Sequence, residues 1–148
     1  MKDHFNRLSQ YNRWANRRVL DGLKNQTVPE KALALLSHAV LAESVWQMRL
    51  IEKPVSTGVF DVLSLDKIEE LMDRNEAGWT SLLESTEDFS RKLDYKMLNG
   101  TPVQSNISDI LTHIFNHGTY HRAQIASLLR QSGLEPASTD FISFSRLG

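Results

Sequence analysis

Apolar residues recur every three or four positions along four long stretches of the chain, the spacing that predicts amphipathic helices. Thr27, three residues before Glu30, predicts a capping box at the start of the second stretch. Ser64 is a candidate cap for the third, and Gly133 follows the end of the fourth. The predicted helices cover residues 3–24, 27–52, 64–85 and 106–130. Four such helices favour an all-α four-helix bundle, and 148 residues fit a single domain over 1–148.

Two shorter stretches depart from the helical pattern. Residues 93–103 alternate in part around Asn99-Gly100, a strong hairpin signal, and Pro102 would place its strand at a sheet edge. We therefore predict a small irregular hairpin between the third and fourth helices. The tail from Pro136 to Phe144 carries apolar residues, which we expect to fold back onto the bundle.

Composition narrows the functional classes. The chain has 17 Lys and Arg against 18 Asp and Glu, for a net charge of −1, so no basic excess favours nucleic acid. Its apolar runs are much shorter than the ~20 residues that span a bilayer, and its start lacks the apolar core of a secretory signal. We expect a cytoplasmic protein that acts on a small molecule, with no nucleic-acid or membrane partner.

The absence of cysteine decides which chemistry remains. Without cysteine there are no disulfides, thiolate nucleophiles or sulfur-ligated metals, so a metal would need His, Asp or Glu ligands. Three of the five histidines, His113, His117 and His121, are spaced by four on the fourth predicted helix. At about 100° per residue, His121 lies inside the apolar stripe of that helix, His117 at its margin and His113 beyond it.

A third inward histidine comes from the second predicted helix. His38 is in phase with the apolar residues of that helix, so it should face the bundle interior together with His117 and His121. Three neutral imidazoles on facing helices would leave coordination positions open, as catalytic sites require. Such a set suits Zn, Ni, Cu or Fe(II). The alternative is three separate core histidines, each with its own hydrogen-bond partner.

Two further residues are candidates for a role beside the histidines. Glu43 lies near the edge of the face that carries His38 and could orient a ligand or accept a proton. The alternative for Glu43 is an ordinary solvent-exposed helix carboxylate. Gln124 falls near the histidine pair on the helical wheel and could hydrogen-bond a ligand or line a pocket. Glu43 and Gln124 are the two residues that the sequence offers as candidates for a catalytic role.

Several segments resemble the DinB/YfiT-like family. These are Tyr11 to Asn16, Leu36-Ser37-His38, and above all His113 to Gln124. The resemblance covers nearly the whole chain and implies an up-down-down-up bundle that is often a homodimer. It also implies a divalent metal, for which Zn or Ni is expected, on His38, His117 and His121. His113 occurs in many relatives and is not a usual ligand.

The resemblance also suggests a reaction class. Characterised relatives use the metal with low-molecular-weight thiols such as bacillithiol or mycothiol, as S-transferases or isomerases. Because this chain has no thiol of its own, a thiol cofactor would supply the nucleophile. Hydrolysis by metal-activated water is equally compatible with the ligands. We expect a metal-dependent S-transferase or hydrolase in stress or detoxification. The alternatives are a non-catalytic metal-binding stress protein, a small-molecule binder, or a helical interaction module without metal.

Overall fold

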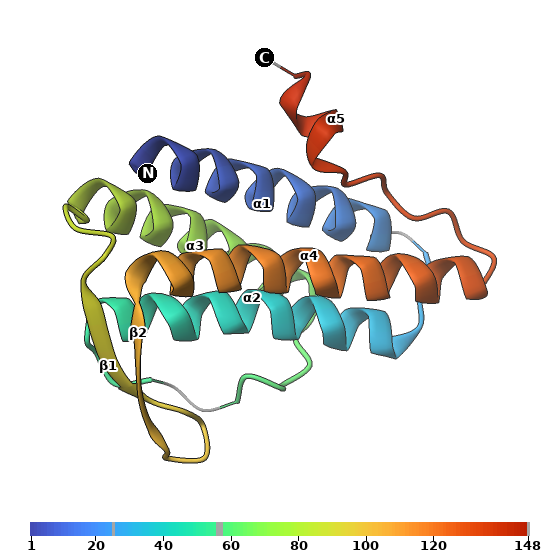
Figure 1. The fold of residues 1–148 in the computed structure, drawn as a ribbon. Coiled ribbons are helices and arrows are strands. Elements are labelled where there is room, and N and C mark those ends of the chain that lie inside the picture. Colours follow the sequence, from blue (N-terminus) through green and yellow to red (C-terminus); the bar gives the residue numbers. More distant parts are fainter. Residues whose placement is uncertain (25, 56–57, 148) are drawn as a thin grey trace.

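A computed structural model describes residues 1–24, 26–55 and 58–147 of the chain (Figure 1). It confirms the four long helices and the hairpin, with boundaries close to the predicted ones. The tail adds one short helix. The elements in chain order are α1 (Lys2–Leu23), α2 (Glu30–Leu50), α3 (Leu65–Ser85), β1 (Lys92–Lys96), β2 (Pro102–Asn106), α4 (Ile107–Gln131) and α5 (Phe141–Ser145).

The helices have the up-down-down-up arrangement. Figure 1 shows α1 and α4 running in one direction and α2 and α3 running in the other. Helix α2 packs against both α3 and α4, and α1 packs against the same two helices, while α1 and α2 scarcely touch. Helices α1 and α2 are therefore diagonal in the bundle, and the α2–α4 contact is the most extensive. Within the described residues, no helix is both long and apolar enough to span a lipid bilayer.

The core consists of two apolar clusters separated by a polar layer. One cluster includes Phe5, Trp79 and Leu111, and the other includes Leu20 and Leu36. Apart from Ser37, which lies among members of the second cluster on α2, the buried polar residues of the long helices fall between members of the two clusters. These residues are Asn12 and Asn16 on α1, Glu43 on α2, Asn75 on α3 and Arg122 on α4. A buried polar layer must satisfy its own hydrogen bonds, so it restricts how the helices can align.

Two of the predicted helix ends are confirmed and one is wrong. The hydroxyl of Ser64 accepts a hydrogen bond from the Lys67 amide at 3.3 Å, as a cap should. Gly133 follows α4 with a φ of 75°, the left-handed conformation that favours glycine at this position. The capping box at Thr27 does not form. Instead Pro29, with an extended ψ of 133°, is the residue before α2, and it makes no side-chain cap.

The hairpin covers one end of the α2–α4 pair. Its antiparallel register runs from Lys92 opposite Asn106 to Lys96 opposite Pro102. Gly100 lies in the turn with a φ of 86°. The ring of Tyr95 packs edge-on against Trp46 of α2, with 5.2 Å between ring centroids. The hairpin is thereby held against α2 by an aromatic contact.

The tail folds back onto α1, as predicted. Phe141 packs against Tyr11 at 5.1 Å between ring centroids, and Phe144 packs against Trp14 at 5.7 Å. The hydroxyl of Tyr11 also donates to the backbone carbonyl of Thr139 at 2.8 Å. These contacts place α5 beside α1, away from the hairpin end of the bundle (Figure 1).

Candidate metal centre

Packing of α2 against α4 brings three imidazoles together. His38 of α2 and His117 and His121 of α4 each offer a ring nitrogen, and these three atoms all lie within 4.8 Å of one another. The Nε2 atoms of His117 and His121 are 3.0 Å apart. The ring of His38 lies 5.1 Å from that of His117 and 4.9 Å from that of His121. This group of three could hold a metal ion.

Hydrogen bonds to the outer ring nitrogens fix two of the imidazoles. Nδ1 of His38 lies 2.9 Å from the carbonyl oxygen of Val59, and Nδ1 of His121 lies 2.7 Å from Oε1 of Gln124. Both partners are oxygens that only accept, so the imidazoles must donate through Nδ1–H. The lone pairs at Nε2 are then left for a metal. Acceptors of this kind commonly orient metal-binding histidines.

The electrostatics of the site favour neutral imidazoles. Burial, followed by the neighbouring charges of His121, His38 and His113, lowers the pKa of His117 to about 4. Burial also lowers the pKa of His121, against the opposing effect of its bond to Gln124. A metal binds only the neutral form of an imidazole, so both side chains are ready to coordinate at neutral pH.

One buried atom at the site lacks a partner. Nδ1 of His117 is buried and has no hydrogen-bond partner among the residues that the structure describes. Its other ring nitrogen faces Nε2 of His121 instead of an oxygen acceptor. Converging nitrogen lone pairs repel one another unless a proton or a cation lies between them. The residues present therefore fit a divalent transition metal bound by three nitrogen ligands.

Two residues that contact His38 were not predicted from the sequence. The side chain of Phe60 stacks on His38 with 4.8 Å between ring centroids and 3° between the planes, although the residue is 73% exposed. Val59, its neighbour, supplies the carbonyl that holds His38. Both lie in the connection between α2 and α3, where no helical period exists to relate a residue to the helix face that it approaches.

His113 lies one turn before His117 and is not among the three grouped nitrogens, in line with its predicted place beyond the apolar stripe. Its ring centroid is 5.7 Å from that of His117 and 5.5 Å from that of Trp46. Partial burial, and then the charge of Arg49, lower the pKa of His113. This residue therefore links the histidine cluster to the wall of a neighbouring pocket.

The structure separates the two weak candidates. Gln124 lies at the cluster as the partner of His121. Glu43 is buried, so its interpretation as a solvent-exposed carboxylate is wrong. Its carboxylate accepts hydrogen bonds from Asn12 and Asn16 at 2.9 Å and from Trp79 at 2.8 Å. Among the described residues, no hydrogen bond connects it to the three histidines.

Glu43 belongs to the polar layer of the core. Burial raises its pKa despite the three donors and the nearby Arg122. Nη1 of Arg122 donates to the side-chain oxygens of both Asn12 and Asn16 at 2.7 Å. The two asparagines thus bridge a buried guanidinium and a buried carboxyl group. Their spacing of four on α1 was the one signal in the sequence that could have revealed this network.

Comparison with known proteins gives consistent results. The sequence model of the DinB family matches residues 1–147. "Protein DinB" of Bacillus subtilis (strain 168) is 27% identical over 160 residues, which cover 95% of this chain and 93% of that protein. The crystal structure of a DinB-like protein from Bacillus cereus superposes with a TM-score of 0.69 at 22% identity. That match covers 92% of this chain and 95% of the other and supports the same fold.

Proposed function

The chain belongs to the DinB family, and from this premise we propose that it is a divalent-metal-dependent enzyme of stress or detoxification. His38, His117 and His121 are its metal ligands. The reaction is transfer of a low-molecular-weight thiol to an electrophilic small molecule. The observation that carries the proposal is the convergence of three imidazole nitrogens within 4.8 Å of one another, with no carboxylate or thiolate in the group.

The composition of the ligand set supports catalysis over a structural role. Three neutral ligands leave the charge of a divalent cation uncompensated, and at least one coordination position stays open. A bound Zn or Ni would act there as a Lewis acid that lowers the pKa of a thiol or of water. The chain has no cysteine, so any thiol that reacts must come from a separate molecule.

The remaining residues of the site have positioning roles in this proposal. Val59 and Gln124 hold the rings of His38 and His121 through their Nδ1–H groups. Phe60 covers one face of His38 and limits contact of that ring with water. Hydrogen-bond acceptors such as Val59 and Gln124 raise the basicity of the imidazole ligands and fix their orientation. In this proposal Gln124 acts by orienting His121, a metal ligand.

A thiol-transfer assay tests the proposal. Tag-free protein loaded with Zn or Ni is mixed with 1-chloro-2,4-dinitrobenzene and, in turn, bacillithiol, mycothiol or glutathione. We expect thiol conjugation above the uncatalysed rate, loss of the excess rate on chelation, and recovery on addition of metal. The double variant His117→Ala, His121→Ala should stay at the uncatalysed rate.

Other outcomes select the alternatives. Metal binding without turnover of any thiol or ester would identify a non-catalytic metal-binding stress protein or small-molecule binder. Metal-dependent ester cleavage without added thiol would identify a hydrolase. Absence of metal binding would leave a helical interaction module.

The proposal includes a homodimer, which the family resemblance supports, and the cytoplasmic location that the sequence analysis expects. Light scattering of the purified chain tests the dimer, and fractionation of the cells that express it tests the location.

A further inference from the structure

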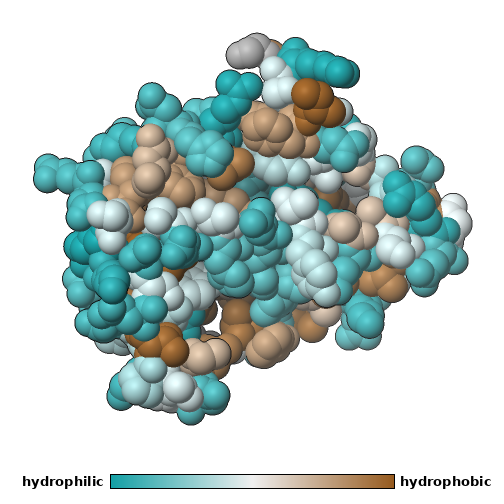
Figure 2. Space-filling model, in the orientation of Figure 1, coloured by the Kyte–Doolittle hydropathy of each residue, from teal (hydrophilic) through white to brown (hydrophobic). Residues whose placement is uncertain are grey.

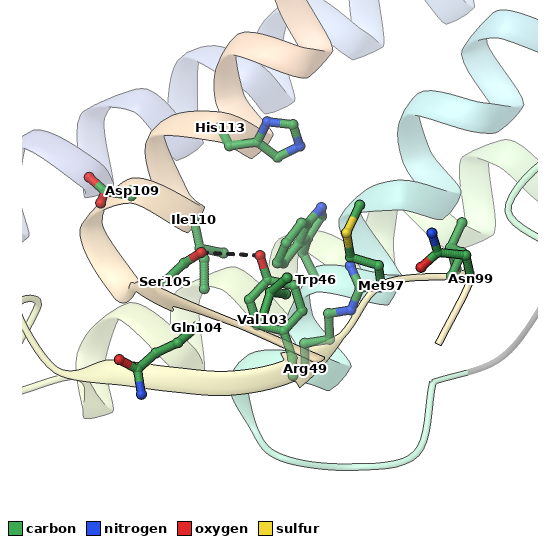
Figure 3. Close-up of a pocket in the computed structure, with 12 residues that line it drawn as sticks. Trp46, Arg49, Met97, Asn99, Val103, Gln104, Ser105, Asp109, Ile110 and His113 are labelled. Carbon is green, nitrogen blue, oxygen red and sulfur yellow. Dashed lines mark hydrogen bonds between the residues drawn. The ribbon is translucent and has the colours of Figure 1, made fainter. Parts of the chain in front are cut away.

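A large pocket lies beside the histidine cluster, between the hairpin and the ends of α2 and α4. Its volume is about 770 Å³, within the ~300–1,000 Å³ usual for small-molecule sites. Figure 3 shows Trp46 and Arg49 of α2 beneath His113 of α4, with Met97 of the hairpin turn beside them. Figure 2 shows apolar residues around a hollow at the lower edge of that face of the molecule, next to the hairpin.

The pocket adjoins the histidine cluster at His113. His113 lines the pocket, and its ring lies 5.7 Å from that of His117. Arg49 follows His38 by eleven residues on α2, which is three helical turns, so both lie on nearly the same face. The two are then separated by roughly 16 Å along the helix axis. A molecule bound at Arg49 would have to extend roughly that far, past His113, to reach the three histidines.

Arg49 is the one cationic side chain among the residues that line this pocket. Its guanidinium stacks over Trp46 at 4.5 Å and over Tyr95 at 5.1 Å from the ring centroids, and Nη2 donates to the carbonyl of Lys96 at 3.0 Å. These contacts hold the planar group in place. Within the described ranges, no carboxylate lies within ion-pair distance of it.

The polar groups of Arg49 are incompletely satisfied. Its Nε is buried without a hydrogen-bond partner in the described part of the chain. Burial lowers the pKa of the guanidinium, as expected when a positive charge leaves water without an anion beside it. Arg49 is half-buried, so its charge is partly removed from water and would gain from an anionic partner. A guanidinium matches a carboxylate through two parallel hydrogen bonds. The part of the chain that the structure describes supplies no such partner here.

The rest of the pocket is suited to an apolar body. Met97 and Leu98, in the hairpin turn, are 49% and 61% exposed, although both line the pocket. Val103 and Ile110 add further apolar surface from β2 and α4. Asp109, also on the lining, is exposed to solvent. The lining also holds polar side chains, among them the carboxylate of Asp109, so Arg49 is its one positive charge. A single cation favours a monoanion with an apolar body over a dianion, which would require a second cation.

We propose that this pocket binds an elongated small-molecule monocarboxylate, with its carboxylate on Arg49 and its apolar body against Trp46 and the hairpin turn. The catalytic meaning of this site rests on the proposed function, because the far end of the ligand would then lie at the metal. Binding itself does not depend on the metal. The two ideas can therefore fail separately.

Amide-resolved NMR titration tests the inference with a matched pair of probes, 6-phenylhexanoate and the neutral 6-phenylhexanamide. In chelator-treated wild-type protein we expect saturable shifts of amide signals at the pocket when the carboxylate is added. The affinity for the amide should be lower than that for the carboxylate by about tenfold or more. Arg49→Met should reduce affinity for the carboxylate to that for the amide. Arg49→Lys, which keeps the charge but loses the planar group, should bind with intermediate affinity.

Two control variants make the test specific. Arg130→Met removes an exposed cation from the last turn of α4 and should leave binding unchanged. His117→Ala removes a proposed metal ligand and should also leave carboxylate binding unchanged, which separates this site from direct metal coordination. Equal binding of acid and amide by the wild type would overturn the inference. So would undiminished binding in a folded Arg49→Met variant, or the absence of saturable shifts in the wild type.

Discussion

Substitution of Gly118 by alanine tests the buried polar layer that aligns α1 and α4. Helix propensity alone predicts a gain of about 1 kcal/mol, because alanine is the best helix former and glycine among the worst. In this structure a Cβ at position 118 would lie 2.5 Å from Oδ1 of Asn12 and 3.0 Å from Nη1 of Arg122. Neither distance is compatible with normal contact, so a neighbour has to move.

The neighbour cannot move without loss. Asn12 is 2% exposed, its amide donates to Glu43 at 2.9 Å, and its oxygen accepts from Arg122 at 2.7 Å. Displacing it breaks at least one buried hydrogen bond to a charged group, at a cost of about 1.5–3 kcal/mol, and adds overpacking strain of about 1–3 kcal/mol. After subtraction of the propensity gain, Gly118→Ala should lower the free energy of unfolding by about 1.5–5 kcal/mol.

Gly22→Ala is the matched control. Gly22 also lies in a helix, but a Cβ there would meet only Ala137, at 4.0 Å. This variant should be as stable as the wild type or more stable by up to about 1 kcal/mol. Urea denaturation followed by far-UV circular dichroism measures both. If Gly118→Ala is as stable as Gly22→Ala, the close packing of α1 on α4 through Asn12 is wrong.

Three further predictions follow from the site and the polar layer. In metal-free protein, lowering the pH from about 6.5 to about 4 should destabilise the fold by about 1–2 kcal/mol after allowance for solvent screening. His117 is protonated below a pKa of about 6.5 in the unfolded chain but only below about 4 in the native state, so the free energy of unfolding falls as the pH falls between these values. Urea titrations at several pH values, with His117→Gln as control, measure this dependence. Trp79→Phe removes the indole donor to Glu43 and should cost about 1–3 kcal/mol in urea unfolding, whereas Trp14→Phe, at the α5 contact, should cost less. Zinc at about 100 times its Kd should stabilise the fold by ~2.7 kcal/mol and raise Tm by about 5–10 °C in calorimetry, with no rise when the ligands are removed.

The features that could be predicted from the sequence are mainly those that follow from the periodic spacing of apolar residues. The 3.6-residue repeat gives both the extent of a helix and the direction of each side chain, so the spacing of His38, His117 and His121 among apolar residues was enough to place them on inward faces. Asn99-Gly100 identified the hairpin because few other turns suit that pair. To predict that the three histidines meet, it was necessary only to assume that the second and fourth helices are neighbours.

The parts that were missed depend on tertiary contacts. Glu43 lies near the edge of an apolar stripe, and its burial follows from Asn12 and Asn16 on a helix remote in sequence. Phe60 reaches His38 from a connection without any regular period. The position of Arg49 between Trp46 and Tyr95 exists only because the hairpin folds over α2. No local pattern encodes any of these contacts.

Elemental analysis of tag-free protein tests the central claim most directly. The wild type is compared with His117→Ala, His121→Ala and with a control, His4→Ala, His113→Ala, which also loses two histidines but keeps the proposed ligands. After incubation with Zn or Ni and removal of excess metal, we predict about one equivalent per chain in the wild type and in the control, and none in the ligand variant. Equal metal content in all three proteins, or no metal in the wild type, would contradict a metal site built from His38, His117 and His121.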